Sequence, residues 1–156
     1  MIKFLKIYLI LLLVILITGC SYKPILSKQN YDFSVEKVEL NGDKEVNYII
    51  KERLINLKNQ NAKNKYYVQI ETSKIKNIIS NDSKGDPSKL EIIISSTFQI
   101  SNSEKLLIKR NVKMKNIYNN NSDKLKLKEY ESIIINNLSQ RISDSLISTI
   151  ININDN

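Results

Sequence analysis

Alternation of apolar and polar residues predicts three long strands in the middle of the chain. Residues 66–73 alternate in this way, and the pattern can continue as far as residue 78. Residues 90–101 and 106–115 repeat the alternation, separated by a short polar turn that begins at Asn102. Successive side chains of a strand point to opposite faces, so each strand would bury one face and expose the other. We expect these strands to pair in sequence order.

A shorter strand is predicted ahead of them, over residues 33–40. The parity of its apolar positions changes between Val35 and Val38. Such a change is typical of a β-bulge or of an early strand end.

Apolar residues spaced three and four apart predict two amphipathic helices. The first begins at Asp43, whose carboxylate can cap it, and runs for about five turns to Gln60. Its apolar stripe consists of Val46, Ile49, Ile50, Leu54 and Leu57. The second helix begins at Asp123 and meets no Gly or Pro in the rest of the sequence. Its apolar stripe consists of Leu127, Tyr130, Ile134, Leu138, Ile142, Leu146 and Ile150.

The order strand, helix, three strands, helix predicts an α+β fold. Two amphipathic helices packed on one face of a four-stranded mixed sheet would bury both apolar sets at once, as a two-layer sandwich. We expect this single domain to span residues 33–156. Residues 20–32 contain Pro24 and have no usable periodicity, so they are expected to form a tether.

The first 19 residues have the pattern of a bacterial lipoprotein signal peptide. Lys3 and Lys6 precede 11 uninterrupted apolar residues, which are too few to cross a bilayer core that needs about 20. Thr18 and Gly19 are small, and the only cysteine of the chain, Cys20, follows them. We expect cleavage of residues 1–19 before Cys20. The alternative is an uncleaved N-terminal anchor with a chance cysteine.

Cys20 is the expected site of lipid attachment. Its thiol would carry a diacylglycerol group and its new amino group an N-acyl chain, and two or three chains hold a protein stably on a membrane. No other cofactor is expected. Ser21 stands where lipoproteins kept in the inner membrane often have Asp, which favours the periplasmic side of the outer membrane.

Composition narrows the possible functions. The formal net charge is +8, so the surface could bind nucleic acid, anionic lipid or glycolipid phosphate. An exported lipoprotein meets lipids first, so we expect no nucleic-acid partner. Histidine is absent and Cys20 is committed to lipid, which excludes Cys-His and Ser-His nucleophiles and the usual zinc ligand sets. Neighbouring carboxylates such as Glu129 and Glu131 are usually solvated, so we expect neither an enzyme nor a metal site.

One face of the last two strands is the candidate binding surface. Alternation places Lys109, Lys113 and Lys115 together on the face turned away from the helices. The neighbouring strand adds polar side chains to that face, namely Ser95, Thr97, Gln99 and Ser101. Such a face could hold phosphates through charge-assisted hydrogen bonds. The alternative is a solvated face in a lysine-rich chain, although Ile93 and Leu107 would then be exposed.

From residue 19 onward the chain resembles the LPS-assembly lipoprotein LptE family. Residues 19–26 read Gly-Cys-Ser-Tyr-Lys-Pro-Ile-Leu, similar to the Gly-Cys-Gly-Phe-x-Pro-Leu-Tyr start of many members. Residues 87–90 read Pro-Ser-Lys-Leu and enter a strand, where the family often has Thr-Arg; Lys89 stands where that Arg is common. That strand ends here in Phe-Gln-Ile at residues 98–100, where Tyr-x-Leu is common, and a helix led by Tyr130 follows.

The resemblance implies the same α+β fold and a role in lipopolysaccharide transport. The partner would be the LptD β-barrel, which the lipoprotein plugs and helps to assemble, and the ligand would be lipopolysaccharide. Candidate lipopolysaccharide contacts are Lys89, Lys109, Lys113 and Lys115. Two alternatives stay open: an auxiliary lipoprotein of a phospholipid-trafficking ABC system, and a structural lipoprotein without a ligand.

Overall fold

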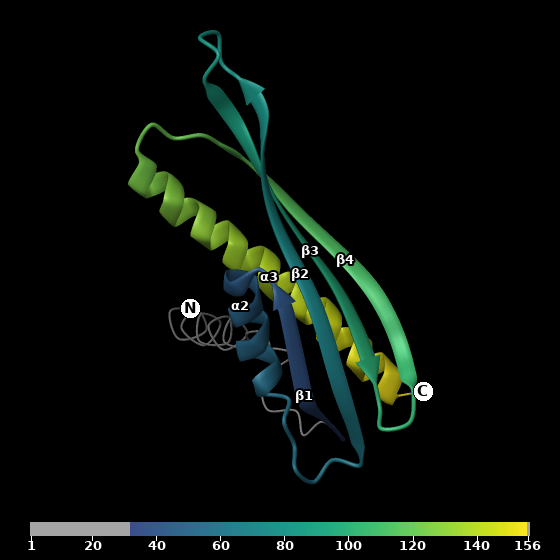
Figure 1. Cartoon of the computed structure of the whole chain (residues 1–156). Helices are drawn as coiled ribbons and strands as arrows, with labels where there is room; N and C mark the ends of the chain where they lie inside the picture. Colours follow the sequence, from purple (N-terminus) through teal and green to yellow (C-terminus); the bar gives the residue numbers. More distant parts are fainter. Residues whose placement is uncertain (1–31, 156) are drawn as a thin grey trace, which may run out of the picture. The chain divides into compact units, whose positions relative to one another are not determined.

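The computed structural model describes residues 32–155 and shows a four-stranded sheet with two helices packed on one face (Figure 1). The elements are β1 (Phe33–Gly42), α2 (Lys44–Ile55), β2 (Asn64–Asn81), β3 (Pro87–Ser101), β4 (Leu106–Asn119) and α3 (Lys124–Asn154). The strands lie in the order β1-β2-β3-β4, with β1 parallel to β2 and the other pairs antiparallel. The predicted two-layer α+β fold with a mixed sheet is therefore confirmed. The signal peptide, Cys20 and nearly all of the tether lie outside the described residues.

Strand β1 contains the predicted irregularity. Its pairing with β2 shifts register between Val35 and Lys37, and the strand continues to Gly42, so of the two predicted alternatives the structure shows the β-bulge and not an early end. The bulge lets Phe33 and Val35 on one side of it and Val38 and Leu40 on the other all pack against the core.

Helix α2 begins as predicted and ends earlier than predicted. The Asp43 side chain caps it by accepting a 3.0 Å hydrogen bond from the backbone N–H of Val46. The helix ends at Ile55 rather than near Gln60. Leu57 is buried outside it, and its carbonyl accepts a 3.4 Å hydrogen bond from the backbone N–H of Val35. This bond to β1 replaces a further helical turn.

Strands β2, β3 and β4 are longer than their sequence patterns required. Strand β2 continues to Asn81, and β4 continues past residue 115 to Asn119. The turn between β2 and β3 is held by Asp82, whose side chain accepts hydrogen bonds from the N–H groups of Lys84 and Asp86. Gly85 in that turn has a φ of 90°, which favours glycine.

The core lies between the inner face of the sheet and the two helices. Helix α2 covers β1 and β2, while α3 runs obliquely across β3 and β4 and also contacts α2 (Figure 1). Two small α3 residues, Ser139 and Ser143, are fully buried, which lets the helix approach its neighbours closely. An ion pair between Arg53 and Asp144 joins α2 to α3. Tyr130, expected in the apolar stripe, is instead 50% exposed.

The start of β4 also differs from the alternation. Ile100 is paired with Ile108 and Ser101 with Leu106, so Leu107 is an extra residue in this ladder. Leu106, expected to face the core, is 54% exposed, whereas Leu107, expected on the outer face, packs against the core. A bulge therefore exchanges the two leucines, and the sequence pattern gives no sign of it because both residues are Leu.

Candidate functional site

The register of β3 and β4 places three predicted lysines on the outer face of the sheet, the face turned away from the helices. Lys109 is opposite Gln99, Lys113 is opposite Ser95, and Lys115 is opposite Ile93. We call Lys109, Lys113 and Lys115 the basic row. At about 3.4 Å per residue, the row extends for roughly 20 Å along β4. All three lysines are exposed.

The members of the basic row differ in their electrostatic partners. The ammonium of Lys115 lies 3.3 Å from a carboxylate oxygen of Glu91, whose side chain is only 9% exposed. No ion pair joins Lys109 or Lys113 to an acid among residues 32–155. Lys109 and Lys113 are therefore the row's two cations that are available to an added anion.

Lys89, the fourth predicted contact, lies apart from the row. It is exposed and pairs in register with Asn119, four residues beyond Lys115 on β4. That separation is about 14 Å along the strand. The structure therefore places Lys89 on the same face, on the neighbouring strand and beyond the end of the row.

Polar side chains on the same face hold one another in place. The side-chain amide of Asn111 donates a 2.9 Å hydrogen bond to the hydroxyl of Thr97. Nearer the β1 edge of this face, the amide of Gln69 donates a 2.8 Å hydrogen bond to Glu39. The face between these pairs carries hydroxyl and amide groups that can donate hydrogen bonds to phosphate oxygens.

Two apolar residues that sequence analysis did not assign to this face also lie on it. Ile75 of β2 pairs with Ile93 of β3, and Ile117 of β4 pairs with Glu91. Ile75 and Ile117 are each 51% exposed. The periodicity of β2 already suggested that Ile75 was in a strand, but its neighbours depend on a register that the sequence alone does not give.

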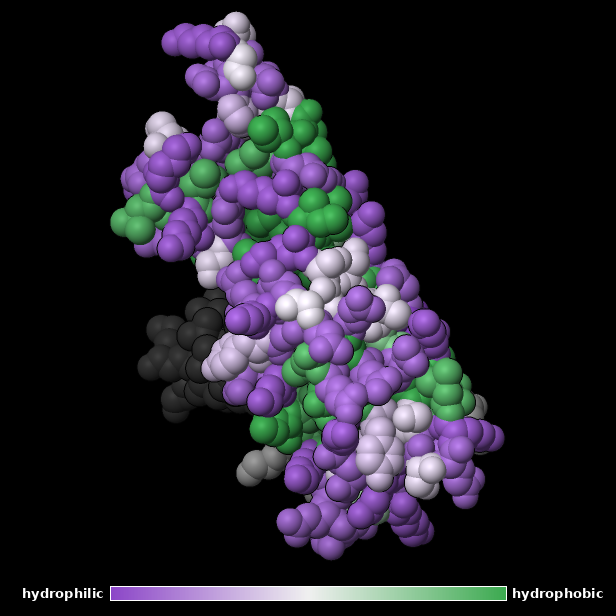
Figure 2. Space-filling view, viewed as in Figure 1, coloured by the Kyte–Doolittle hydropathy of each residue, from purple (hydrophilic) through white to green (hydrophobic). Residues whose placement is uncertain are grey.

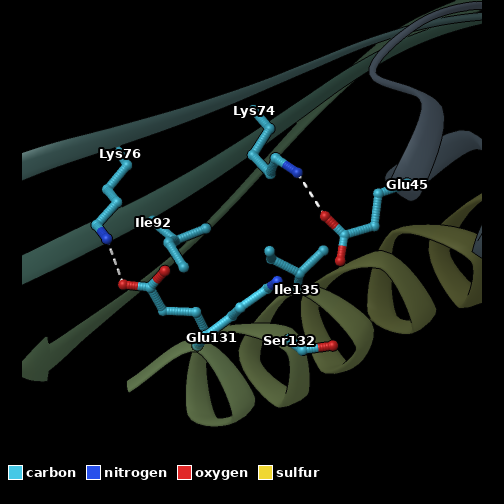
Figure 3. A pocket seen from close by; sticks show the side chains of 8 residues that line it. Glu45, Lys74, Lys76, Ile92, Glu131, Ser132 and Ile135 are labelled. Carbon is cyan, nitrogen blue, oxygen red and sulfur yellow. Dashed lines mark hydrogen bonds and ion pairs between the residues drawn. The ribbon is translucent and has the colours of Figure 1, made fainter. Parts of the chain in front are cut away.

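A second feature is a cleft of about 340 Å³ between the helices and β2, with an apolar floor and charged walls (Figure 3). Lys74 and Lys76 enter it from β2, and Glu131 enters it from α3. The ammonium of Lys74 lies 2.6 Å from Glu45 and 3.3 Å from Asp43 at the start of α2. Lysines at inward positions of an alternating strand were the available sequence signal for this cluster.

Glu131 is the centre of a network in this cleft. It forms an ion pair with Lys76 and accepts a 2.7 Å hydrogen bond from the hydroxyl of the buried Tyr118. Burial alone would raise the pKa of Glu131, but the hydrogen bonds from Lys76 and Tyr118 outweigh it and hold that pKa below its usual value. Burial, together with the bond to Glu131, raises the pKa of Tyr118. The network therefore keeps Glu131 charged and Tyr118 neutral.

The second lysine of the cleft is stabilised in the same way. Burial alone would lower the pKa of Lys74, but its hydrogen bonds to Glu45 and Asp43 raise that pKa by more, so the net shift is upward. Because these charges are paired with one another, the arrangement ties β2 to both helices.

Within residues 32–155 no group of three or more acids, histidines or cysteines could hold a metal ion. No described helix is both long and apolar enough to span a membrane.

Comparison with known proteins gives structural matches only. No protein-family model matches the chain, and no curated protein sequence matches it. The crystal structure of rare lipoprotein B from Shewanella oneidensis matches with a TM-score of 0.55 at 18% identity, over 76% of this chain and 98% of that one.

Two further solved structures match over similar lengths. A minor lipoprotein from Acinetobacter baumannii matches with a TM-score of 0.52 at 15% identity, over 75% of this chain and 94% of that one. The solution structure of lipoprotein B from Nitrosomonas europaea has a TM-score of 0.55 at 10% identity, over 80% of this chain and 88% of that one. The fold of residues 32–155 is thus one that solved bacterial lipoproteins share.

Proposed function

We propose that the protein is an outer-membrane lipoprotein of the lipopolysaccharide transport machinery, with no catalytic activity, which plugs and helps to assemble the LptD β-barrel. The observation that carries the proposal is the basic row on the open face of the sheet, where Lys109 and Lys113 have no acid partner among the described residues. The LptE-like sequence features and the fold shared with bacterial lipoproteins support it.

The chemistry of the ligand matches the row. Lipid A carries phosphates, and an ammonium that donates to a phosphate forms a charge-assisted hydrogen bond about twice as strong as a neutral one. Lys109 and Lys113 lie roughly 14 Å apart along β4, with Asn111 between them on the same face. Separate anionic groups of one glycolipid can therefore contact separate cations.

The proposed place inside a barrel also has a physical basis. The interior of a large outer-membrane barrel is polar and hydrated. Most outward positions of β3 and β4 present amides, hydroxyls and lysines, which suit such a lumen. Cys20, with its diacylglycerol and N-acyl chains, would hold the protein on the periplasmic side of the outer membrane.

Co-purification tests the partner. Affinity-tagged protein extracted from membranes in mild detergent should bring down a large β-barrel in stoichiometric amount. Recovery of an ABC transporter with its substrate-binding protein would instead support the phospholipid-trafficking alternative. The Cys20→Ala variant should move to the soluble periplasmic fraction, and its retention in membranes would contradict lipid attachment at this residue.

Charge reversal tests the basic row. Lys109→Glu combined with Lys113→Glu should weaken lipopolysaccharide binding without lowering the thermal unfolding temperature, since both lysines are exposed. The matched control is Lys58→Glu with Lys63→Glu, which makes the same charge change at exposed loop positions. Equal binding by the two double variants would assign Lys109 and Lys113 to a solvated surface.

A further inference from the structure

Three isoleucines form a contiguous apolar area on the outer face, towards the end of the sheet that carries the β2–β3 loop. Ile75 lies directly opposite Ile93 on the neighbouring strand. Ile117 of β4 lies diagonally from Ile93, because their direct partners are Glu91 and Lys115. Figure 2 shows apolar side chains gathered below that loop on the face it displays. We call Ile75, Ile93 and Ile117 the isoleucine patch.

The patch is a local property of the sheet. Nearer the β3–β4 turn, the same three strands carry Gln69, Thr97 and Asn111 at outward positions. An antiparallel sheet with one solvated face usually alternates apolar-in and polar-out. Three adjacent apolar residues on three strands depart from that rule, and such areas mark surfaces that bind something.

The charges beside the patch indicate what covers it. Lys115 is the direct partner of Ile93, and Lys113 lies two residues further along the same face. The ammonium of Lys115 forms an ion pair with Glu91, whereas Lys113 has no acid partner among the described residues. An apolar area bordered by an available cation is complementary to an amphiphile, with its chains on the isoleucines and its anionic group on the lysine.

A second copy of the chain fits the patch poorly. Stacking two outer faces would bring the basic rows of both copies close together, and like charges held close in an interface are unfavourable. The polar lumen of a barrel suits the lysines and amides of this face, but it offers no apolar partner to the three isoleucines. A phosphorylated lipid can place its acyl chains on the isoleucines and its phosphate at Lys113.

We propose that the isoleucine patch is an acyl-chain subsite for the lipid A part of lipopolysaccharide, with a phosphate at Lys113. The inference rests on the proposed function and extends it from the anionic groups of the ligand to its chains. The subsite makes binding depend on the number of acyl chains as well as on charge.

The test compares two ligands on the full-length protein immobilised in non-ionic detergent. Intact lipopolysaccharide should bind more tightly than de-O-acylated lipopolysaccharide, which keeps its phosphates but has fewer chains. Ile75→Thr combined with Ile117→Thr should reduce affinity for the intact form by about tenfold or more and leave the de-O-acylated form nearly unchanged. Threonine is β-branched and both sites are half-exposed, so the strands should persist.

The matched control is Ile55→Thr with Ile133→Thr, which removes two isoleucines of similar exposure, 56% each, from the helices. This control should bind both ligands as the wild type does. Equal affinity of the wild type for both ligands, or an equal loss in both double variants, overturns the subsite but leaves the charge contacts of the proposed function intact. Failure of the wild type to bind either ligand overturns both proposals. Tighter binding to phosphatidylglycerol vesicles than to lipopolysaccharide overturns the commitment to lipid A.

Discussion

The two faces of the same strands follow different physical rules. On the inner face of β3, Ile94 and Phe98 are fully buried beneath the helices. On the outer face, their chain neighbours Ser95 and Thr97 are partly exposed and lie beside the basic row. One residue along the chain is enough to pass from a position governed by packing to one governed by solvent and ligand.

The difference shows where function can be placed in this fold. Inner positions must fill space closely, so their side chains are constrained by volume. Outer positions of β4 contribute little to packing and are free to carry cations. The exception is the cleft, where Lys74 and Lys76 occupy inward positions of β2. They are tolerated there because Glu45 and Glu131 pair with them.

The largest expected effect on stability comes from truncating a buried side chain of the inner face. Phe98→Ala should lower the free energy of unfolding by about 3–5 kcal/mol, because Phe98 is fully buried and truncation leaves a cavity. Thr97→Ala, on the adjacent outer position, should change it by less than about 0.5 kcal/mol. Urea unfolding followed by circular dichroism measures both. Similar losses in the two variants would contradict the assignment of the faces.

An intermediate effect on stability is expected from removing Glu131, which pairs with Lys76 in the charged cleft. Glu131→Ala removes the acceptor of the buried Tyr118 hydroxyl and the partner of Lys76. Leaving such a group unpaired should cost about 1–3 kcal/mol in the free energy of unfolding. Glu129→Ala, at an exposed position of the same helix, is the control and should have almost no effect. Recovery of stability in Glu131→Ala with Lys76→Met and Tyr118→Phe would show that unpaired polar groups cause the loss.

The smallest expected effect is a change with pH in the stability that Glu131 contributes. The folded-state pKa of Glu131 is held below its unfolded value, so its contribution is complete above the ordinary glutamate pKa of about 4.3. The contribution is lost as the pH falls through the lower folded value. Glu131→Gln should therefore be less stable than the wild type at pH 7, with the difference shrinking below about pH 4. A constant difference between pH 7 and pH 3 in thermal unfolding would contradict this network.

Local patterns predicted much of the fold. The parity change in residues 33–40 located the bulge of β1, and the carboxylate of Asp43 located the start of α2. Helix α3 was recognisable because its apolar residues recur at helical spacing without Gly or Pro. The lysines of β4 could be assigned to one face because alternation has a period of two.

Other features depended on contacts between segments that are distant in the chain. Helix α2 ends at Ile55, and just beyond it the carbonyl of Leu57 bonds to β1, a segment more than 20 residues earlier in the chain. The exchange of Leu106 and Leu107 depends on how β4 aligns with β3. The sequence showed Glu131 only as a carboxylate near Glu129. Its partner Tyr118 lies on β4, and only the packing of α3 on the sheet brings the two side chains together.

By itself, the sequence determined the lipoprotein-like start, the number and order of the elements, and which side of each strand is apolar. These are short-range properties, since periodicity and capping depend on residues a few positions apart. Only the tertiary structure decided that Ile75, Ile93 and Ile117 are neighbours. It also decided that Lys115 pairs with Glu91, while Lys113 has no acid partner within residues 32–155. Strand register sets those neighbours, and register is fixed by packing of the whole sheet against the helices.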